Sequence, residues 1–196
     1  METSNTRERI LEAAVDVLAQ RGYSSAGVQE IVELSGTSKG SFYFHFPSKE
    51  QMVMALVERM GAKLISKVQN SIQKEVNPVH RVIASVDVLV TTFARQRKVA
   101  QVLLLSILGH GRDSDRKFLP MRERFSDLIR QELDIAVKQG YIEPVDTILV
   151  SRMWVGALHE VILRWLLTGH PNPLTVAIPT LRATLLRSIG INSDST

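Results

Sequence analysis

The apolar residues of this chain recur every three or four positions along almost its whole length, which is the spacing of amphipathic helices. The first two stripes cover residues 10–18 and 28–34. Gly22 and Gly36 follow them, and glycine suits the position just after a helix because it adopts left-handed backbone angles without strain. The pattern therefore predicts one long and one short helix at the start of the chain.

A short third helix is predicted between Ser38, a capping residue, and Pro47. It carries Phe42 and Phe46 four positions apart, so both rings share one face. So short a helix is not stable alone in water. The two rings are therefore expected to face inward and hold this helix against the first one.

A long fourth helix is predicted to begin at residues 48–51, whose sequence Ser-Lys-Glu-Gln is a capping box. Its apolar stripe recurs every four residues and ends before Asn77-Pro78. The stripe comprises Met52, Leu56, Met60, Leu64, Val68 and Ile72. Further helices are predicted at about 79–97, 99–109, 120–139, 146–168 and 173–190.

No convincing alternating run predicts a strand, so the predicted fold class is all-α with about nine helices. The predicted domains are an N-terminal three-helix head, residues 1–50, and a C-terminal helical bundle for ligand binding and dimerisation, residues 51–196. Pro179 lies inside the last predicted helix and implies a kink or a break near Ile178, with a role that stays open.

Composition narrows the class of protein. The chain has 196 residues, of which 44% are hydrophobic and 22% charged, as in globular proteins. It has no cysteine, which excludes disulfides and thiolate chemistry and favours the cytoplasm. The most apolar stretch, residues 148–167, contains Arg152, Glu160 and Arg164, which argues against a membrane span. No motif of a nucleophile with its base, a carboxylate pair or a glycine-rich phosphate loop is present, so we expect neither an enzyme nor a cofactor or metal site.

Charge alone does not identify a partner. The formal net charge is +4, but residues 1–50 hold five basic and seven acidic residues, a net of −2. Residues 51–196 hold the remaining excess, a net of +6. Residues 34–49 are different, because they contain two lysines and no acid. A nucleic-acid site near the N-terminus therefore depends on local arrangement.

The second and third helices, joined by a turn that begins with glycine, form the pattern of a helix-turn-helix, whose second helix enters the major groove of DNA. Lys39 and Tyr43 share its outer face, and Tyr43 and His45 can donate hydrogen bonds to phosphate oxygens. Two alternatives stay open here: Tyr43 packs in the core, and His45 is merely solvated.

The run ILEAAVDVLAQRGYSSAGVQEIVELSGTSKGSFYFHFPSKEQMV resembles the DNA-binding head of tetracycline-repressor-type (TetR-family) transcriptional regulators, over about residues 7–56. Gly27 departs from that pattern, which usually has Thr or Ser as the cap of the second helix. The resemblance implies sequence-specific binding to double-stranded DNA. The DNA contacts that it implies are Gln29, Ser38, Lys39, Gly40, Ser41, Tyr43, Phe44, His45 and Lys49.

The helix predicted at 146–168 is apolar on nearly every face, so it needs cover on two sides, and a second copy of the chain would supply one of them. The resemblance implies the same homodimer, through the last two long helices. Two heads would then meet a pseudo-palindromic operator. The predicted interface residues are Leu158, Val161, Ile162, Trp165 and Leu185.

The body of the chain is large for dimerisation alone, so an apolar ligand cavity is predicted there, with a filled core as the alternative. A small hydrophobic or aromatic effector would fit it. The resemblance favours a repressor released by that effector; an activator, or a DNA-binding dimer without an effector, stays open. The predicted lining residues are Phe93, Leu103, Leu104, Ile107, Phe118, Phe125 and Trp154.

Overall fold

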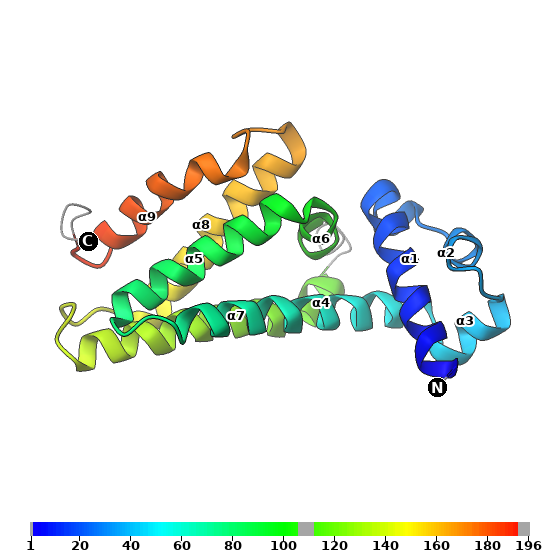
Figure 1. Ribbon diagram of the computed structural model, residues 1–196, viewed down its shortest axis with the longest axis horizontal. Helices are drawn as coiled ribbons and strands as arrows, with labels where there is room; N and C mark the ends of the chain where they lie inside the picture. The colour runs from blue at the N-terminus through cyan, green and yellow to red at the C-terminus, as the bar shows by residue number, and fades with distance from the viewer. Residues whose placement is uncertain (1, 106–111, 192–196) are drawn as a thin grey trace. The chain divides into compact units, whose positions relative to one another are not determined.

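The computed structural model describes residues 2–105 and 112–191, with side chains over 5–104 and 119–191, and each regular element within these ranges is helical, as predicted. Figure 1 shows these elements in chain order. They are α1 (Glu2–Ser25), α2 (Val28–Ser35), α3 (Lys39–His45), α4 (Lys49–Ile72), α5 (Pro78–Arg95), α6 (Arg97–Ala100), the π-helix η1 (Gln101–Leu105), α7 (Arg112–Lys138), α8 (Thr147–Thr168), the 3-10 helix η2 (Leu174–Ala177) and α9 (Ile178–Arg187).

Contacts divide the chain into two units. The first comprises Met1–Ala62 with Arg97–Asp115, and the second Lys63–Gln96 with Arg116–Thr196. The helix α4 contributes to both units. The predicted domains, 1–50 and 51–196, are defined by function rather than by contacts, and that boundary stays a prediction.

In the first unit, the helices end where their glycines and caps allow it. Gly22, with φ 72°, interrupts the regular helix of α1, and one more turn follows it. Gly36 is left-handed, with φ 59°, and its N–H donates to the carbonyl of Glu33. The hydroxyl of Ser38 then accepts from the backbone N–H of Ser41 at 3.0 Å and starts α3.

The small core of the first unit holds α3 in place. Phe42 and Phe46 are both buried, with ring centroids 6.0 Å apart, and α3 packs against α1 and α2. This confirms that the two rings face inward. The guanidinium of Arg7 lies 5.2 Å from the centroid of Phe46 and covers that ring.

A second basic side chain of α1 fixes the turn between α2 and α3. The Arg9 guanidinium donates to the carbonyl of Ser35 at 2.6 Å and to that of Gly36 at 2.9 Å. These carbonyls lie at the C-terminal end of α2, where no helical N–H is available to them. Arg9 therefore ties the turn to the first helix by charge-assisted hydrogen bonds.

The prediction for α4 is confirmed. The hydroxyl of Ser48 accepts from the N–H of Gln51 at 3.1 Å, which is one half of the predicted capping box. All six residues of the predicted stripe are buried: Met52, Leu56, Met60, Leu64, Val68 and Ile72.

In the second unit, α5 packs against α8, η2 and α9 (Figure 1). The interior includes Trp154, Ile129, Leu133 and Ile162, all at most 2% exposed. The indole N–H of Trp154 is not left unpaired, because it donates to the hydroxyl of Ser188 at 2.9 Å.

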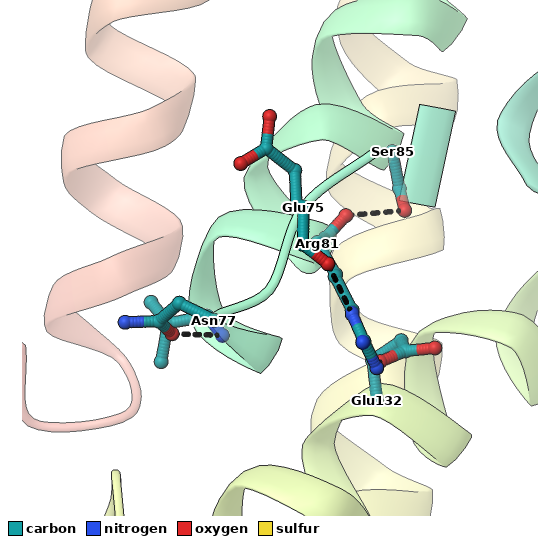
Figure 2. Close-up of polar contacts among 6 residues, drawn as sticks. Glu75, Asn77, Arg81, Ser85 and Glu132 are labelled. Atoms are coloured by element: carbon teal, nitrogen blue, oxygen red, sulfur yellow. Dashed lines mark hydrogen bonds and ion pairs between the residues drawn. The ribbon is translucent and has the colours of Figure 1, made fainter. Parts of the chain in front are cut away.

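Figure 2 shows how Arg81 joins three parts of this unit. Its Nε donates to the backbone carbonyl of Glu75 at 2.8 Å, and its Nη1 lies 3.4 Å from a carboxylate oxygen of Glu132 on α7. The carbonyl of Arg81 accepts from Ser85. Below it, Asn77 caps α5 by accepting from the N–H of Val79 at 2.8 Å. The loop before α5, α5 itself and α7 are thus linked through one side chain.

The last predicted helix is divided near Ile178, as Pro179 implies. The 3-10 helix η2 covers Leu174–Ala177, and α9 begins at Ile178, which places Pro179 in its first turn. A proline there removes no helical hydrogen bond, because N–H groups of the first turn have no helical partner. The helix predicted at 99–109 is the π-helix η1 after α6 as far as residue 105, and its remainder lies outside the described residues.

We expect Gly36→Ala to lower the free energy of unfolding by about 1–2 kcal/mol, because an L-residue is strained at φ 59°. The added Cβ would also lie 2.8 Å from Nη2 of Arg9 and disturb that tether. Gly40→Ala is the matched control, since its Cβ would meet no atom closer than the Ser38 hydroxyl at 3.8 Å. Thermal unfolding followed by circular dichroism measures both; equal stability of Gly36→Ala and the parent chain would contradict the role assigned to this turn.

Candidate nucleic-acid interface

The outer face of α3 is exposed. Tyr43 is 51% and Phe44 78% exposed, and Lys39 is exposed as well, whereas Ser41 and His45 are half-buried. This exposure excludes the alternative that Tyr43 is a core residue. The ring of Tyr43 stands edge-on to buried Phe42, with centroids 5.3 Å apart, which limits the freedom of the Tyr43 ring.

Gly40 lies on this face, and its surroundings among the described residues do not require a glycine. Its backbone is helical, and a Cβ would make only an ordinary contact, at 3.8 Å, with the hydroxyl of Ser38. Glycine lowers helix stability by roughly 1 kcal/mol relative to alanine. Nothing within the described residues needs glycine here, but an approaching phosphate or base would have closer access to the backbone.

The hydroxyl of Ser38 has two roles available. As an acceptor it caps α3, through the N–H of Ser41. Its own proton stays available to donate to a phosphate oxygen, because a hydroxyl both accepts and donates. The predicted contact by Ser38 is thus compatible with its capping role.

Lys39 and Lys49 differ sharply in their surroundings. Lys39 makes no ion pair among the described side chains, so its charge faces solvent. Lys49 is half-buried: its ammonium donates to the carbonyls of Tyr23 at 2.9 Å and Ala26 at 3.0 Å, and lies 4.6 Å from the centroid of the Tyr23 ring. Two of its three donors therefore join the end of α1 to the start of α4.

Two residues at the start of α2 bear on DNA binding: Gln29, with its side-chain amide, and Gly27, the N-cap residue, which has no side chain. Gln29 is exposed, and its amide nitrogen donates to the carboxylate of Glu33 one turn later at 2.6 Å. Its amide oxygen stays free to accept. Gly27 caps α2 without any side-chain hydrogen bond, and a Cβ added there would have no other residue beyond its chain neighbours within 4 Å. The start of α2 therefore offers no side-chain hydroxyl at the position where the family usually has Thr or Ser.

The acidic residues of the head are largely occupied by partners. Glu8 pairs with Arg59 at 2.6 Å, Asp16 with Lys98 at 2.6 Å, and Glu30 with Arg21 at 3.4 Å. These pairs neutralise charge that would otherwise repel phosphate. The net charge of −2 over residues 1–50 thus does not describe the surface around α3, whose flanking run 34–49 has no acid.

Two residues that support this face were missed by the reasoning from sequence. Arg9 holds the turn before α3, and Arg7 covers the ring of Phe46. Arg9 contacts carbonyls 26 and 27 positions further along the chain. No spacing pattern signals such a contact, because it depends on how α1 and α2 pack.

The predicted ligand-lining residues fall in different units. Phe93 and Trp154 are buried and Phe125 is half-buried in the second unit, while Leu103 and Leu104 belong to the first. Ile107 lies outside the described residues, as does the side chain of Phe118. A single cavity lined by all seven therefore stays a prediction.

A cavity of about 450 Å³ lies elsewhere in the second unit, between α5 and α9. The ion pair between Asp87 and Arg182 lies at its wall, with Nε of Arg182 2.7 Å from a carboxylate oxygen. None of the predicted ligand residues lines it; its lining comprises Glu75, His80, Ile83, Ala84, Asp87, Pro179, Arg182, Ala183 and Leu186.

Four of the five predicted interface residues are covered within their own chain. Leu158, Ile162, Trp165 and Leu185 are at most 6% exposed, and Val161 is half-buried. These four side chains pack mainly within their own chain, and their part in a dimer contact stays a prediction. A helix that is apolar all round does not reveal which of its apolar faces the chain itself will cover.

A different face of α8 is open. Leu149, Met153 and Leu167 are 55%, 57% and 67% exposed, and they share a face with exposed Ala157. The ion pair of Glu160 and Arg164, at 3.2 Å, lies between them along the helix. Among the described residues, no helix is long and apolar enough to cross a membrane.

Comparison with known proteins agrees with this picture. The model of the family described as "Bacterial regulatory proteins, tetR family" matches residues 10–56. The fatty acid metabolism regulator protein of Bacillus subtilis (strain 168) is 23% identical over 174 residues, which cover 85% of this chain and 86% of that protein. The HTH-type transcriptional repressor KstR2 of Mycobacterium tuberculosis (strain H37Rv) is 26% identical over 175 residues, or 87% and 86% of the two chains.

Solved structures have the same fold. The crystal structure of the transcriptional regulator FadR from Bacillus subtilis in complex with stearoyl-CoA matches with a TM-score of 0.87. The match covers 93% of this chain and 98% of that one at 20% sequence identity. The all-α architecture with an N-terminal helix-turn-helix is therefore confirmed.

Replacing Lys39 should change DNA binding, whereas replacing Lys49 should change the stability of the fold. Lys39→Ala should leave thermal stability unchanged and flatten the slope of log affinity against log salt by about 2 for two heads on one DNA site, at about 0.9 per phosphate. Lys49→Ala should lower the free energy of unfolding by about 1.5–3 kcal/mol, the value of a hydrogen bond to a charged group. Salt titrations of DNA binding and thermal unfolding of both variants measure this. A stable Lys49→Ala variant would contradict its structural role.

Proposed function

We propose that this chain is a homodimeric repressor, which a long-chain acyl compound releases from its operator. The chain belongs to the tetR family of bacterial regulatory proteins and is a DNA-binding transcriptional regulator, and the proposal starts from this membership. Such a repressor works in the cytoplasm on the chromosome. The observation that carries the proposal is the likeness over 85% or more of the chain to a fatty acid metabolism regulator and to a structure that holds stearoyl-CoA.

The DNA-binding step uses α3 in the major groove. Lys39, Tyr43 and His45 contact phosphate oxygens, which position the head without reading sequence. Gln29 and Ser41 are the polar groups offered to base edges, and an amide pairs well with adenine. The approach is close because Gly40 has no side chain.

The dimer forms through the open face of α8. The exposed side chains of Leu149, Met153 and Leu167 become buried against the same face of a second copy, as in an isologous two-fold interface. Small Gly156 and Ala157 allow the two helices to approach closely. Each buried apolar side chain contributes about 1.5–3 kcal/mol at full burial. A two-fold dimer presents two heads to a pseudo-palindromic operator.

The effector step uses the second unit. A long acyl chain needs an apolar cavity, and the buried side chains Phe93 and Trp154, with half-buried Phe125, are the apolar groups offered there. The phosphates of a coenzyme A group would meet the basic excess of residues 51–196, a net of +6. An effector that favours one spacing of the two heads by about 1–3 kcal/mol changes operator affinity by roughly 5–150-fold.

We expect Met153→Glu to turn the dimer into a monomer, because each copy would bring a carboxylate without a partner into a contact that otherwise contains apolar side chains and the Glu160–Arg164 ion pair. Sedimentation equilibrium measures the change. The matched control is Val76→Glu, which places the same charge on a side chain that is 89% exposed in the loop before α5 and should leave the dimer intact. A dimeric Met153→Glu variant would refute this interface.

Stearoyl-CoA should raise the melting temperature and release the protein from operator DNA, since a ligand that binds the folded chain stabilises it. Coenzyme A without the acyl chain is the control and should do neither. Thermal shift and fluorescence anisotropy with labelled operator measure the two effects. Specific operator binding that no acyl-CoA alters would leave a dimeric regulator without this effector, and tighter binding with the ligand would replace release by co-repression.

A further inference from the structure

The cavity of about 450 Å³ between α5 and α9 has two walls, each of which is one face of a helix. The residues of each wall are three or four positions apart, which is the spacing of a single helix face. The α5 wall comprises His80, Ile83, Ala84 and Asp87, and the α9 wall comprises Pro179, Arg182, Ala183 and Leu186. The two helices run in opposite directions and contact each other (Figure 1). The cavity is therefore a gap between two helix faces that pack against each other on either side of it.

Small side chains in the middle of both walls leave this gap. Ala84 on α5 and Ala183 on α9 are both half-buried, and neither side chain extends beyond Cβ. Protein interiors are close-packed, so larger side chains at these positions would fill the space. The volume lies within the range of small-molecule pockets, roughly 300–1,000 Å³. The two alanines thus leave room for the hydrocarbon part of a small ligand.

One end of the cavity holds an ion pair that is satisfied within the chain. Nε and Nη2 of Arg182 donate to the two carboxylate oxygens of Asp87, with the Nε contact at 2.7 Å. The hydrogen bond to Asp87 raises the pKa of the Arg182 guanidinium, so the pair stays ionised at neutral pH. Because the two groups face each other in a paired arrangement, their charges cancel. Neither group is left to attract a charged ligand.

Glu75, in the loop before α5, brings a different kind of carboxylate to the cavity. It is half-buried, and its backbone carbonyl accepts from Arg81. Figure 2 shows its carboxylate turned away from the Arg81 guanidinium. Among the side chains that the structure describes, none forms an ion pair with this carboxylate. A partly buried carboxylate without a partner has an unfavourable free energy that a cation would lower.

The charge of the cavity is opposite to that of the surrounding chain. Residues 51–196 have a net charge of +6, whereas the lining of the cavity has one carboxylate, that of Glu75, in excess once the ion pair is set aside. An anion would be repelled by Glu75 and would find the guanidinium of Arg182 occupied. A ligand ammonium would instead be attracted, and a neutral imidazole at His80 can accept one of its N–H groups.

We propose that this cavity is a second ligand site, which binds a primary aliphatic amine. The ammonium group pairs with Glu75, and the alkyl chain lies between Ala84 and Ala183. A ligand in this position contacts α5 and α9 at once and stabilises their packing. The inference goes beyond the proposed function, because it requires neither DNA nor the acyl effector.

Titration calorimetry of the full-length protein with hexylamine tests the site. We expect one molecule bound per chain. 1-Hexanol keeps the alkyl chain but has no charge, so it should bind about tenfold more weakly or less. Hexanoate, which has the same chain with the opposite charge, should not displace hexylamine.

Glu75→Gln removes the charge and keeps the shape of the side chain, so it should weaken hexylamine binding about tenfold. Glu143→Gln is the matched control, since it removes the same charge from an exposed position of the same unit and should bind as the parent does. Ala183→Leu fills the gap and should abolish binding. Ala84→Leu fills it from the opposite wall, and the melting temperature of each variant shows whether it folds.

Absence of hexylamine binding to the parent protein would overturn the inference. So would binding that hexanoate displaces, that Glu75→Gln leaves unchanged, or that survives in the folded leucine variants. Failure of operator binding, or of its release by stearoyl-CoA, would contradict the proposed function and leave the amine site standing.

Discussion

The burial of Phe42 is the constraint on which the DNA-binding surface depends. A helix of seven residues has too few internal hydrogen bonds to persist in water, so α3 exists because it is held from outside. Phe42 is fully buried, Phe46 is 3% exposed, and both rings hold α3 against α1. Loss of the Phe42 ring costs about 3–5 kcal/mol in a buried site, which is a large part of a domain's stability. Arg9 helps to set the orientation of α3 relative to α1, because it fixes the turn that precedes α3.

Much of this head is predictable from sequence because its determinants are local. Gly36 and Ser38 mark the turn by backbone preference and capping, and the spacing of Phe42 and Phe46 identifies the buried face. The same holds for α4, whose stripe of six apolar residues is buried throughout. Pro179 also acts locally, and it divides the last helix where its ring requires.

The rest is not predictable because it depends on contacts between distant segments. Lys49 is chemically the same as Lys39, yet its ammonium is occupied by carbonyls that lie 23 and 26 positions earlier. On α8, the residue types of Leu158 and Met153 do not distinguish the side chain that its own chain covers from the one left open. In both cases the amino acid determines what the group can do, and packing determines whether it is available.

The hydrogen bond between Trp154 and Ser188 has an optical consequence. The chain contains two tryptophans, Trp154 and Trp165, both on α8 and both buried in the second unit. Indole emission depends on the polarity around the ring and on the partner of its N–H group. Excitation at the indole band therefore observes the second unit alone, and loss of the hydrogen bond between Trp154 and Ser188 at the end of α9 would change the part of the emission that comes from Trp154. The head contributes no indole signal, so the two units can be followed separately without a label in the second.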